Sequence, residues 1–228
     1  MYKIAIMLYG FPGSGKGTQA NFLAEKLALV HFDTGKVLEA AVHDPKRQKD
    51  PVIARERTFF DTGKLMTPEF VSRELQHHAR QIARAGLGVV FSGSPRTIGE
   101  AHELVPLLEE LYSKQHVYAC YLDVSSTESI RRNSARLICR ECSRPFLSSY
   151  YPKTKPTHCP VCGGMLYKRT LDNPSVIKTR QQEFEERTKP ILKYLRSRGY
   201  HIKKFDGSPA PFALFKKLYG YVQKQQGN

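Results

Sequence analysis

The sequence has no long apolar run. The run nearest its beginning, residues 4–11, is too short to span a bilayer, and it ends at Pro12 without the small-residue cleavage site of a signal peptide. Of the 228 residues, 40% are hydrophobic and 25% are charged, which argues against a disordered or fibrous chain. We therefore expect a globular, cytoplasmic protein that does not insert into a membrane.

Acidic side chains are scarce. Asp and Glu number 21 against 36 Lys and Arg, which gives a net charge of +15. The excess is uneven: residues 1–127 hold 15 basic and 14 acidic side chains, residues 128–180 hold 11 and 3, and residues 181–228 hold 10 and 4. A positive field over the C-terminal part attracts polyanions, and both a nucleotide polyphosphate and a nucleic acid fit it.

Cysteine is scarce too, and four of the five cysteines fall in two close pairs. The pairs are Cys139-x-x-Cys142 and Cys159-x-x-Cys162, with sixteen residues between them. In a cytoplasmic chain this spacing predicts a tetrahedral structural metal site, with zinc as the expected ion and iron as the alternative. Two disulfides or free thiols are the other interpretations, and His158 could replace one thiolate. Four protein ligands leave no place for a reactive water, so the metal would hold its segment together.

Strand-length apolar runs alternate with helical stretches along most of the chain. This alternation predicts an α/β fold with a parallel sheet and helices on both faces. Strands are expected at 3–9, 87–92, 116–124 and 200–205, and helices at 15–29, 98–114, 127–138 and 211–225, with further helices starting at Thr67-Pro68 and Asn173-Pro174. Residues 139–170 show neither a helical nor a strand pattern over a long stretch. This indicates a small inserted unit that needs a cross-link of its own.

A glycine-rich loop follows the first expected strand. The residues Gly10-Phe11-Pro12-Gly13-Ser14-Gly15-Lys16-Gly17-Thr18 match G-x-x-x-x-G-K and lead into a helix. Glycines let successive backbone N–H groups turn around an anionic phosphate, the helix N-terminus adds positive potential, and the lysine reaches the outer phosphates. We therefore predict that residues 13–18 bind the phosphates of a nucleotide. A tight strand-to-helix turn without a ligand is the alternative.

This loop resembles that of adenylate kinases and related nucleoside monophosphate kinases, because Gly17 follows Lys16 and the hydroxyl is displaced to Thr18. Further segments resemble the same family: Asp33-Thr34-Gly35-Lys36-Val37-Leu38-Glu39, Gly63-Lys64-Leu65-Met66-Thr67, Gly93-Ser94-Pro95-Arg96-Thr97, Arg132-x-x-x-Arg136, Arg169 with Asp172, Arg180, and Asp206-Gly207. The cysteine spacing is similar to that of the zinc-bearing lids in part of the family.

The resemblance implies a P-loop core at 1–32, 68–127 and 173–228, a helical acceptor-binding insertion at 33–67 and a small zinc-ribbon lid at 128–172. It implies reversible phosphoryl transfer from ATP to AMP, which gives two ADP. Mg²⁺ would bridge the donor phosphates, and no catalytic base is implied because the acceptor is already an anion. The expected partners are small nucleotides, without membrane or nucleic acid, and the expected state is a monomer.

The resemblance also assigns roles to individual residues. Donor phosphates are bound by Gly13, Ser14, Gly15, Lys16, Gly17, Thr18, Arg132 and Arg136. The expected catalytic side chains are Lys16, Arg96, Arg132, Arg136, Arg169 and Arg180. The expected acceptor-binding residues are Thr34, Gly35, Lys36, Leu65, Met66, Arg96, Glu100, Arg169 and Arg180. Planar guanidinium groups suit these roles because charge develops on phosphate oxygens during transfer.

Four positions depart from the family pattern. Glu39 replaces an arginine expected to meet the acceptor phosphate, although Lys36 could supply that charge one helical turn earlier or pair with Glu39. Glu100 replaces a glutamine that reads adenine, and an ionised carboxylate suits the N–H donors of guanine better, so GMP is an alternative acceptor. Ser92 replaces an aspartate near Mg²⁺, and Leu171 replaces the first aspartate of R-x-D-D. A kinase relative that mainly binds adenine nucleotides is a further interpretation.

A different class of function fits the basic lid. Its basic residues are interleaved with Phe146, Tyr150, Tyr151 and Tyr167, a composition also found in zinc ribbons that bind nucleic acid by charge and stacking. A P-loop nucleotide-binding protein with such a ribbon is the second hypothesis. The arginines on both flanks of the ribbon favour a clamp on a small polyphosphate instead.

Overall fold

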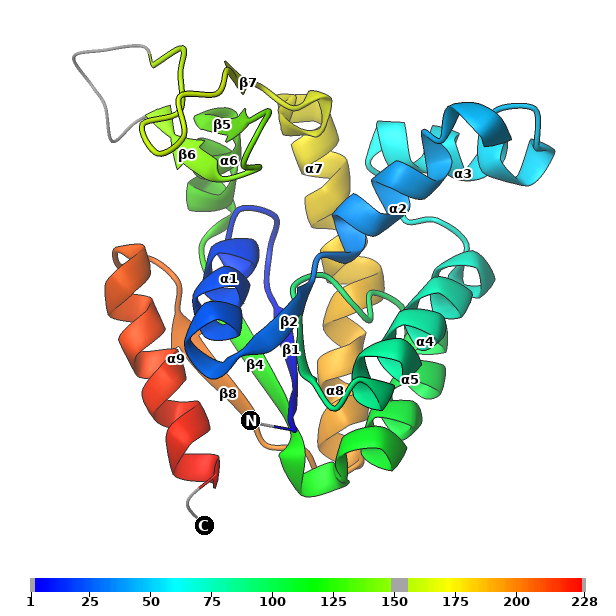
Figure 1. Ribbon diagram of the computed structural model, residues 1–228, viewed down its shortest axis with the longest axis vertical. Helices are drawn as coiled ribbons and strands as arrows, with labels where there is room; N and C mark the ends of the chain where they lie inside the picture. Colours follow the sequence, from blue (N-terminus) through cyan, green and yellow to red (C-terminus); the bar gives the residue numbers. More distant parts are fainter. Residues whose placement is uncertain (1–2, 149–155, 227–228) are drawn as a thin grey trace.

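A parallel sheet forms the centre of the molecule. The computed structural model describes residues 3–148 and 156–226, and within them the sheet has five strands in the order β2-β3-β1-β4-β8 (Figure 1). The strands are β1 (Ala5–Tyr9), β2 (Leu29–Phe32), β3 (Gly88–Phe91), β4 (Val117–Asp123) and β8 (Ile202–Asp206). The strand order reverses at β1, and ligands of open α/β sheets bind at the carboxyl edge beside such a reversal. The predicted α/β fold is confirmed.

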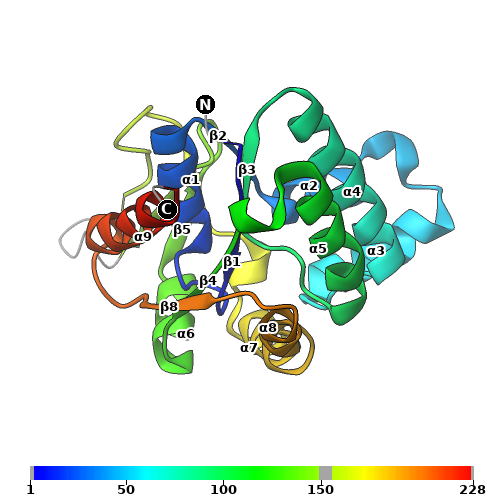
Figure 2. The same ribbon diagram turned by 90° about the horizontal axis from the view of Figure 1, so that it is seen from below.

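Helices cover both faces of the sheet, and the sequence of β1 explains why. Its residues alternate between two apolar clusters, with Ala5, Met7 and Tyr9 in one and Ile6 and Leu8 in the other. The first cluster includes residues of α4 (Pro68–Arg84), α5 (Ile98–Tyr112) and α8 (Lys189–Ser197), and the second includes residues of α1 (Lys16–Leu27) and α9 (Pro211–Gln226) (Figure 2). A strand buried on both sides needs no polar face.

Two smaller units extend from the carboxyl edge of the sheet (Figure 1). One lies between β2 and α4 and contains α2 (Thr34–Val42) and α3 (Pro51–Thr62), which are capped by the carboxylates of Asp33 and Asp50. The other lies between α6 (Ser126–Ser134) and α7 (Pro174–Glu183). It holds a small antiparallel sheet in the order β6-β5-β7, formed by β5 (Arg136–Cys139), β6 (Pro145–Leu147) and β7 (Leu166–Tyr167). A π-helical turn, Phe184–Thr188, connects α7 to α8.

Two expected helix ends are wrong. The helix expected at 15–29 ends at Leu27, and β2 follows it, because Ala28 takes the left-handed conformation with a φ of 52°. Glycine is the usual residue in that conformation, so the sequence carries no stop signal there. The helix expected at 127–138 ends at Ser134, because the next residues pair with β6 and β7. The helices expected to start at Pro68, Pro174 and Pro211 do so.

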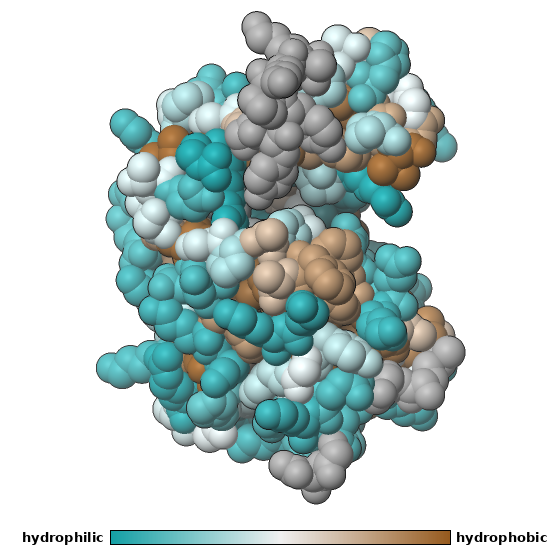
Figure 3. All heavy atoms as spheres, turned by 90° about the vertical axis from the view of Figure 1, so that its left-hand side faces the viewer, coloured by the Kyte–Doolittle hydropathy of each residue, from teal (hydrophilic) through white to brown (hydrophobic). Residues whose placement is uncertain are grey.

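The surface of the described part is mainly polar. On the face shown in Figure 3, hydrophilic side chains predominate and apolar ones gather in a patch near the middle. The large hydrophobic side chains exposed in the described ranges are Val52, Val161, Met165 and Phe212. None of the helices in these ranges has the length and apolar character needed to cross a membrane.

Candidate active site

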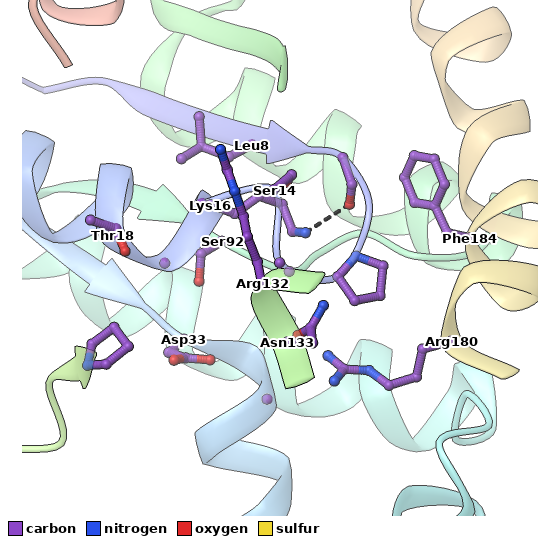
Figure 4. A pocket seen from close by; sticks show the side chains of 18 of the residues that line it. Leu8, Ser14, Lys16, Thr18, Asp33, Ser92, Arg132, Asn133, Arg180 and Phe184 are labelled. Atoms are coloured by element: carbon purple, nitrogen blue, oxygen red, sulfur yellow. Dashed lines mark hydrogen bonds between the residues drawn. The ribbon is translucent and has the colours of Figure 1, made fainter. Parts of the chain in front are cut away.

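A cavity of about 370 Å³ opens at the carboxyl edge of the sheet, beside the loop that follows β1 (Figure 4). Its walls come from this loop, the start of α2, the segment between α3 and α4, the segment after β3, the small sheet and α7. The predicted site residues that line it are Gly13, Ser14, Gly15, Lys16, Gly17, Thr18, Gly35, Leu65, Arg96, Arg132, Arg136, Arg169 and Arg180. Residues predicted from motifs that are far apart in the sequence therefore line one cavity.

Lys16 is the first residue of α1 and binds the loop that precedes it. Its Nζ donates hydrogen bonds to the carbonyl oxygens of Gly10 and Phe11, at 2.7 and 2.8 Å. Burial lowers the pKa of Lys16 well below its ordinary value, and the positive charges of Arg96 and Arg180 lower it further. Both hydrogen-bond acceptors are neutral, so an anion in the cavity would relieve this electrostatic cost.

The loop is packed tightly against α6. Gly13 has a φ of +75°, and a Cβ at this position would lie 2.4 Å from Nδ2 of Asn133, so only glycine fits. The Ser129 hydroxyl donates a hydrogen bond to the Pro12 carbonyl at 2.6 Å, and Gln181 of α7 donates to the Ser129 hydroxyl at 2.8 Å. Helices α6 and α7 therefore fix the shape of the loop. Asn133 was not among the predicted site residues, although it lies between the predicted Arg132 and Arg136.

Two of the predicted arginines form ion pairs that orient them. Arg136 makes a two-pronged pair with the buried Asp172, with Nε 2.9 Å from Oδ2. Arg169 donates to Glu39 of α2 at 3.0 Å. Asp172 alone is therefore enough to orient Arg136, although Leu171 stands beside it in place of a second aspartate. These carboxylates fix guanidinium groups beside the cavity.

Arg180 of α7 lies in a different environment. The hydrogen bond that its guanidinium makes within the described part of the chain is a 3.4 Å contact to the Leu171 carbonyl. Burial, followed by the positive charges of Arg136 and Arg96, lowers the pKa of Arg180 to about 9. The group is still a cation at neutral pH. A phosphate beside it would supply the counter-charge that a carbonyl cannot.

Arg132 joins α6 to the loop that follows β8. Its Nε donates to Glu128 at 2.6 Å, and its terminal nitrogens donate to the carbonyls of Gly207 and Ser208 at 2.9 and 3.0 Å. Although Arg132 lines the cavity, these bonds engage all three of its nitrogens. The expected role of Arg132 at the donor phosphates stays a prediction, because these three bonds leave two of the five N–H groups of its guanidinium unused. Here it fixes the loop that follows β8.

The predicted acceptor residues Thr34, Met66 and Glu100 line a second cavity of about 30 Å³, together with Leu65 and Arg96. This space has room for about two water molecules. A purine base would therefore enter it only after the surrounding helices move apart.

Glu100 has a structural role that the sequence analysis missed. Its Oε2 accepts a hydrogen bond from the Arg96 backbone N–H at 2.8 Å, and its Oε1 accepts one from the Thr97 hydroxyl at 3.1 Å. The Glu100 N–H donates back to Thr97 Oγ1, so the two residues form a variant of the capping box at the start of α5, in which the carboxylate accepts from the Arg96 N–H and not from the N-cap N–H. Burial raises the pKa of Glu100 above its ordinary value. The signal T-x-x-E is visible at 97–100.

Lys36 and Glu39 do not pair with each other. Lys36 lines neither cavity, whereas Glu39 binds Arg169, which lines the larger one. Within the described residues, the charge that α2 brings to the site is therefore the Glu39 carboxylate. The expected role of Lys36 at the acceptor site stays a prediction, because Lys36 lies outside both cavities in this conformation.

Two polar side chains at strand ends face the larger cavity. Asp33 follows β2 and Ser92 follows β3, and both line the cavity near Thr18 (Figure 4). The Ser92 hydroxyl lies 2.8 Å from Nε2 of His31, whose Nδ1 lies 2.6 Å from Asn21 Oδ1. Burial lowers the pKa of His31, so at neutral pH its Nδ1–H donates to Asn21 and its Nε2 accepts from Ser92. The lone pairs of Ser92 remain free to accept.

The four paired cysteines lie in one cluster in the small sheet. All four Sγ atoms lie within 4.8 Å of one another, and the distances are 3.5 Å between Cys139 and Cys162 and 3.7 Å between Cys142 and Cys159. Four thiolates around an ion at about 2.3 Å would lie roughly 3.8 Å apart, whereas a disulfide bond is about 2.05 Å long. The cysteines are unbridged and could hold a metal ion. His158 is outside the cluster.

The aromatic residues of the lid do not form one surface in the described part. Phe146 lines the larger cavity, and Tyr167 lies under the Arg140 guanidinium, which is 5.0 Å from the ring centre. Tyr150 and Tyr151 lie outside the described residues. The arginines that flank the ribbon, Arg136 and Arg169, line the cavity as well.

Comparison with known proteins gives a consistent result. A sequence model of the adenylate kinase family matches residues 8–200. The adenylate kinase of Chlamydia pneumoniae is 33% identical over 193 residues, which cover 85% of each chain. That of Syntrophobacter fumaroxidans is 31% identical over 213 residues, or 93% of this chain and 97% of the relative. That of Geotalea daltonii is 31% identical over 219 residues, or 96% and 99%.

The matched region includes the glycine-rich loop, the six arginine and lysine residues predicted to be catalytic, and the cysteine pairs. The chain spans nearly the whole length of the relatives, so the likeness is not confined to the nucleotide-binding loop. The chain therefore belongs to the adenylate kinase family and is a phosphotransferase that acts on nucleoside monophosphates.

Proposed function

We propose that Lys16 and the arginines around the larger cavity transfer the terminal phosphoryl group of ATP to AMP, with two ADP as products. The observation that carries this assignment is the set of cations on the cavity wall. Lys16 comes from the loop after β1, and Arg96, Arg136, Arg169 and Arg180 come from four other stretches. Cations on several sides of one space suit two phosphate chains held end to end.

The reaction needs positioning and charge neutralisation. An oxygen of the AMP phosphate attacks the terminal phosphorus of ATP, a new P–O bond forms, and the bond to the leaving ADP breaks. The attacking oxygen carries no proton that has to be removed, so no side chain acts as a base. Charge spreads over the equatorial oxygens of the transferred group, and preorganised cations stabilise it there.

On the donor side, we assign the phosphates to Lys16 and the N–H groups of the loop. Lys16 would exchange the carbonyls of Gly10 and Phe11 for phosphate oxygens, and its distance to these carbonyls shows that it is within reach of the loop's interior. The resemblance implies that Asp206-Gly207 opens the loop that holds the donor adenine. Arg132 fixes this loop at Gly207 and would therefore also act on the donor base.

On the acceptor side, we assign the AMP phosphate to Arg96 and Arg169 and the transferred group to Arg136 and Arg180. Arg180 is the arginine that the other three surround, since the positive charges of Arg136, Arg96 and Arg169 all lower its pKa. The ion pairs of Arg136 with Asp172 and of Arg169 with Glu39 use some of their donors, and the remaining N–H groups are available to phosphate oxygens.

Mg²⁺ is the ion that accompanies ATP in this reaction, and when bound it would supply positive charge that neutralises the donor phosphates. The side chains that would hold its hydration shell are Thr18, Ser92 and Asp33. Their oxygen atoms suit a hard cation. Asp33 also opposes the lowering of the Lys16 pKa, which places its carboxylate within electrostatic reach of the phosphate loop.

We further propose that residues 33–67 and 128–172 close over the nucleotides, while 1–32, 68–127 and 173–228 form the core. Closure would exclude water, which competes with AMP as an acceptor. The Arg169–Glu39 ion pair joins these two units in the present conformation, at 3.0 Å.

The metal of the cysteine cluster is zinc in this proposal, with a structural role. Four thiolates fill a tetrahedral ion, and the backbone N–H groups of Cys142 and Val161 donate to the sulfurs of Cys139 and Cys159, as expected for thiolates that share their charge with a metal. The cluster ties β5 to the loops beside β7, and so holds Arg136 near the cavity.

Metal removal is expected to destabilise the lid and spare the core. Elemental analysis should find about one zinc per chain in the purified protein, and chelation should lower the melting temperature by about 5 °C or more. Binding of ATP to the core should persist. Cys142→Ser is the matched control, because it should lack zinc and melt equally low with or without chelator. A chelated wild type with an unchanged melting temperature would show that the cysteines bind no metal.

We propose that Glu100 faces the AMP base and that its protonated form, which burial favours, is the form that binds adenine. A protonated carboxyl group has one donor and one acceptor, like the amide that the family pattern leads one to expect, and so can face adenine N1 and N6. Burial already raises the pKa of Glu100, in spite of the nearby Arg96 N–H and Thr97 hydroxyl, which favour the ionised form. Burial by the base would raise it further.

Initial rates of ADP formation with AMP, GMP, CMP and UMP at fixed ATP test this assignment. We expect AMP to be the best acceptor and its KM to rise with pH as Glu100 ionises. The Glu100→Gln variant should keep the preference for AMP and lose this pH dependence. Faster turnover with GMP would contradict the proposal and support an ionised Glu100 that reads guanine.

A further inference from the structure

Glu56 of α3 is a buried carboxylate that the mechanism does not use. Its side chain is 0% exposed, and it lines neither cavity. Carboxylates are seldom buried so completely unless hydrogen bonds satisfy them. The partners of Glu56 therefore indicate what it does.

Its main partner is Thr67, the N-cap residue directly before α4. Glu56 Oε2 accepts a hydrogen bond from the Thr67 backbone N–H at 2.8 Å, and Oε1 accepts one from the Thr67 hydroxyl at 2.9 Å. Thr67 is the N-cap of α4, yet its side chain does not cap that helix and donates to Glu56 instead. The other partner, Arg55, is 55% exposed and donates to Oε1 at 2.8 Å.

The bond to Thr67 closes the segment that faces the acceptor. Between the end of α3 and Thr67 lie Gly63, Lys64, Leu65 and Met66, and the last three line the smaller cavity. Two of them, Lys64 and Leu65, also line the larger cavity. The position of Thr67 therefore determines where these side chains lie.

The other end of this segment is fixed beside the reaction centre. Gly63 has a φ of +79°, and a Cβ there would lie 2.6 Å from Val176 Cγ1 and 3.1 Å from Arg180 Cγ. The segment therefore starts in tight contact with α7, next to Arg180, and ends at the Glu56 carboxylate. With both ends fixed, the few residues between them have little freedom.

We propose that Glu56 is a positioning residue for the acceptor nucleotide: by holding Thr67 it sets the place of Leu65 and Met66, and so controls the affinity for AMP while touching neither nucleotide. This inference rests on the proposed function. The donor site is built from the loop after β1 and from α6, which Glu56 does not contact, so the affinity for ATP should be independent of it.

The test compares Glu56→Ala with Glu56→Gln and with Glu69→Gln as the matched control. Glu69 lies in the first turn of α4 and is exposed, so it brings similar charge to this helix end without binding Thr67. For Glu56→Ala we expect the KM for AMP to rise about tenfold, the loss typical of a hydrogen bond to a charged group, and the KM for ATP to stay within about twofold. Glu56→Gln can still accept from the Thr67 N–H and should restore part of the affinity. Glu69→Gln should change neither constant.

A second variant keeps the test decisive if Glu56→Ala folds poorly. Thr67→Val removes only the hydroxyl donor and should raise the KM for AMP by a smaller factor. The inference would be overturned if the KM for AMP were unchanged in both Glu56→Ala and Thr67→Val. It would also be overturned if the KM for AMP and the KM for ATP rose by the same factor. In either case Glu56 would be a stabilising residue only. A wild-type protein that does not phosphorylate AMP would instead contradict the proposed function, so the two failures are distinguishable.

Discussion

Replacing Lys16 with methionine is expected to lower kcat by about 10²–10³-fold, the loss seen when one preorganised donor to developing charge is removed. Methionine has a similar length and fills the same space without a charge. The variant therefore keeps the loop packed against α6, where Gly13 and the Ser129 hydrogen bond fix it. Coupled measurement of ADP formation at saturating ATP and AMP gives the rate.

The same variant should not be less stable in the absence of nucleotide. Burial and the neighbouring arginines lower the pKa of Lys16, so the folded state disfavours its charged form. Removing the charge removes that cost, which offsets the loss of the hydrogen bonds to Gly10 and Phe11. Lys26→Met on the exposed side of α1 is the control, with wild-type activity expected. A rate for Lys16→Met close to wild type would show that the donor site lies elsewhere.

Replacing Arg180 with glutamine is expected to lower kcat by about 10³-fold, which corresponds to roughly 4 kcal/mol of transition-state stabilisation. Arg180 lies among the other arginines, and within the described residues it has a carbonyl and no carboxylate as its hydrogen-bond partner. Its charge is therefore available to the transferred group. Initial rates over a matrix of ATP and AMP concentrations separate kcat from the two KM values.

The control for Arg180→Gln is Arg196→Gln on α8, which removes an exposed guanidinium that lines neither cavity. Its kinetic constants should match those of the wild type. If Arg180→Gln raised only the KM for AMP and left kcat unchanged, Arg180 would be a ground-state ligand of the acceptor, and its assignment to the transferred group would be wrong.

The donor loop is the part of the site that the sequence predicts best. Its chemistry is local: three glycines, a lysine and a following helix all fall within residues 10–18. The cysteine pairs are predictable for the same reason, because each pair is a short knuckle and the two knuckles need only meet. Both features rest on spacing along the chain.

The partners of the arginines could not be predicted in this way. Glu39 is 130 positions from Arg169, and Gly207 is 75 positions from Arg132. Whether Arg132 faces a phosphate or a loop carbonyl depends on how α6 lies against the end of β8, which no local pattern encodes. The capping motif of Glu100 is visible at 97–100, whereas its base-reading role is implied only by the family pattern.

The predicted ends of helices and strands are wrong where the backbone takes a conformation that is unusual for its residue. Ala28 ends α1 in a left-handed conformation without glycine, and so β2 was not separated from the helix. The π-helical turn Phe184–Thr188 likewise has no sequence signature, yet it places the Thr188 hydroxyl 2.8 Å from the Arg96 carbonyl and so supports the acceptor side of the site.

The central claim is that one cavity holds two nucleotides and passes a phosphoryl group directly between them. The most direct test is the product ratio in the acceptor assay with ATP and AMP, followed by phosphorus NMR. The account predicts two ADP for each ATP consumed, no release of inorganic phosphate, and no reaction without an acceptor. One ADP and one inorganic phosphate for each ATP, at a rate independent of AMP, would contradict it.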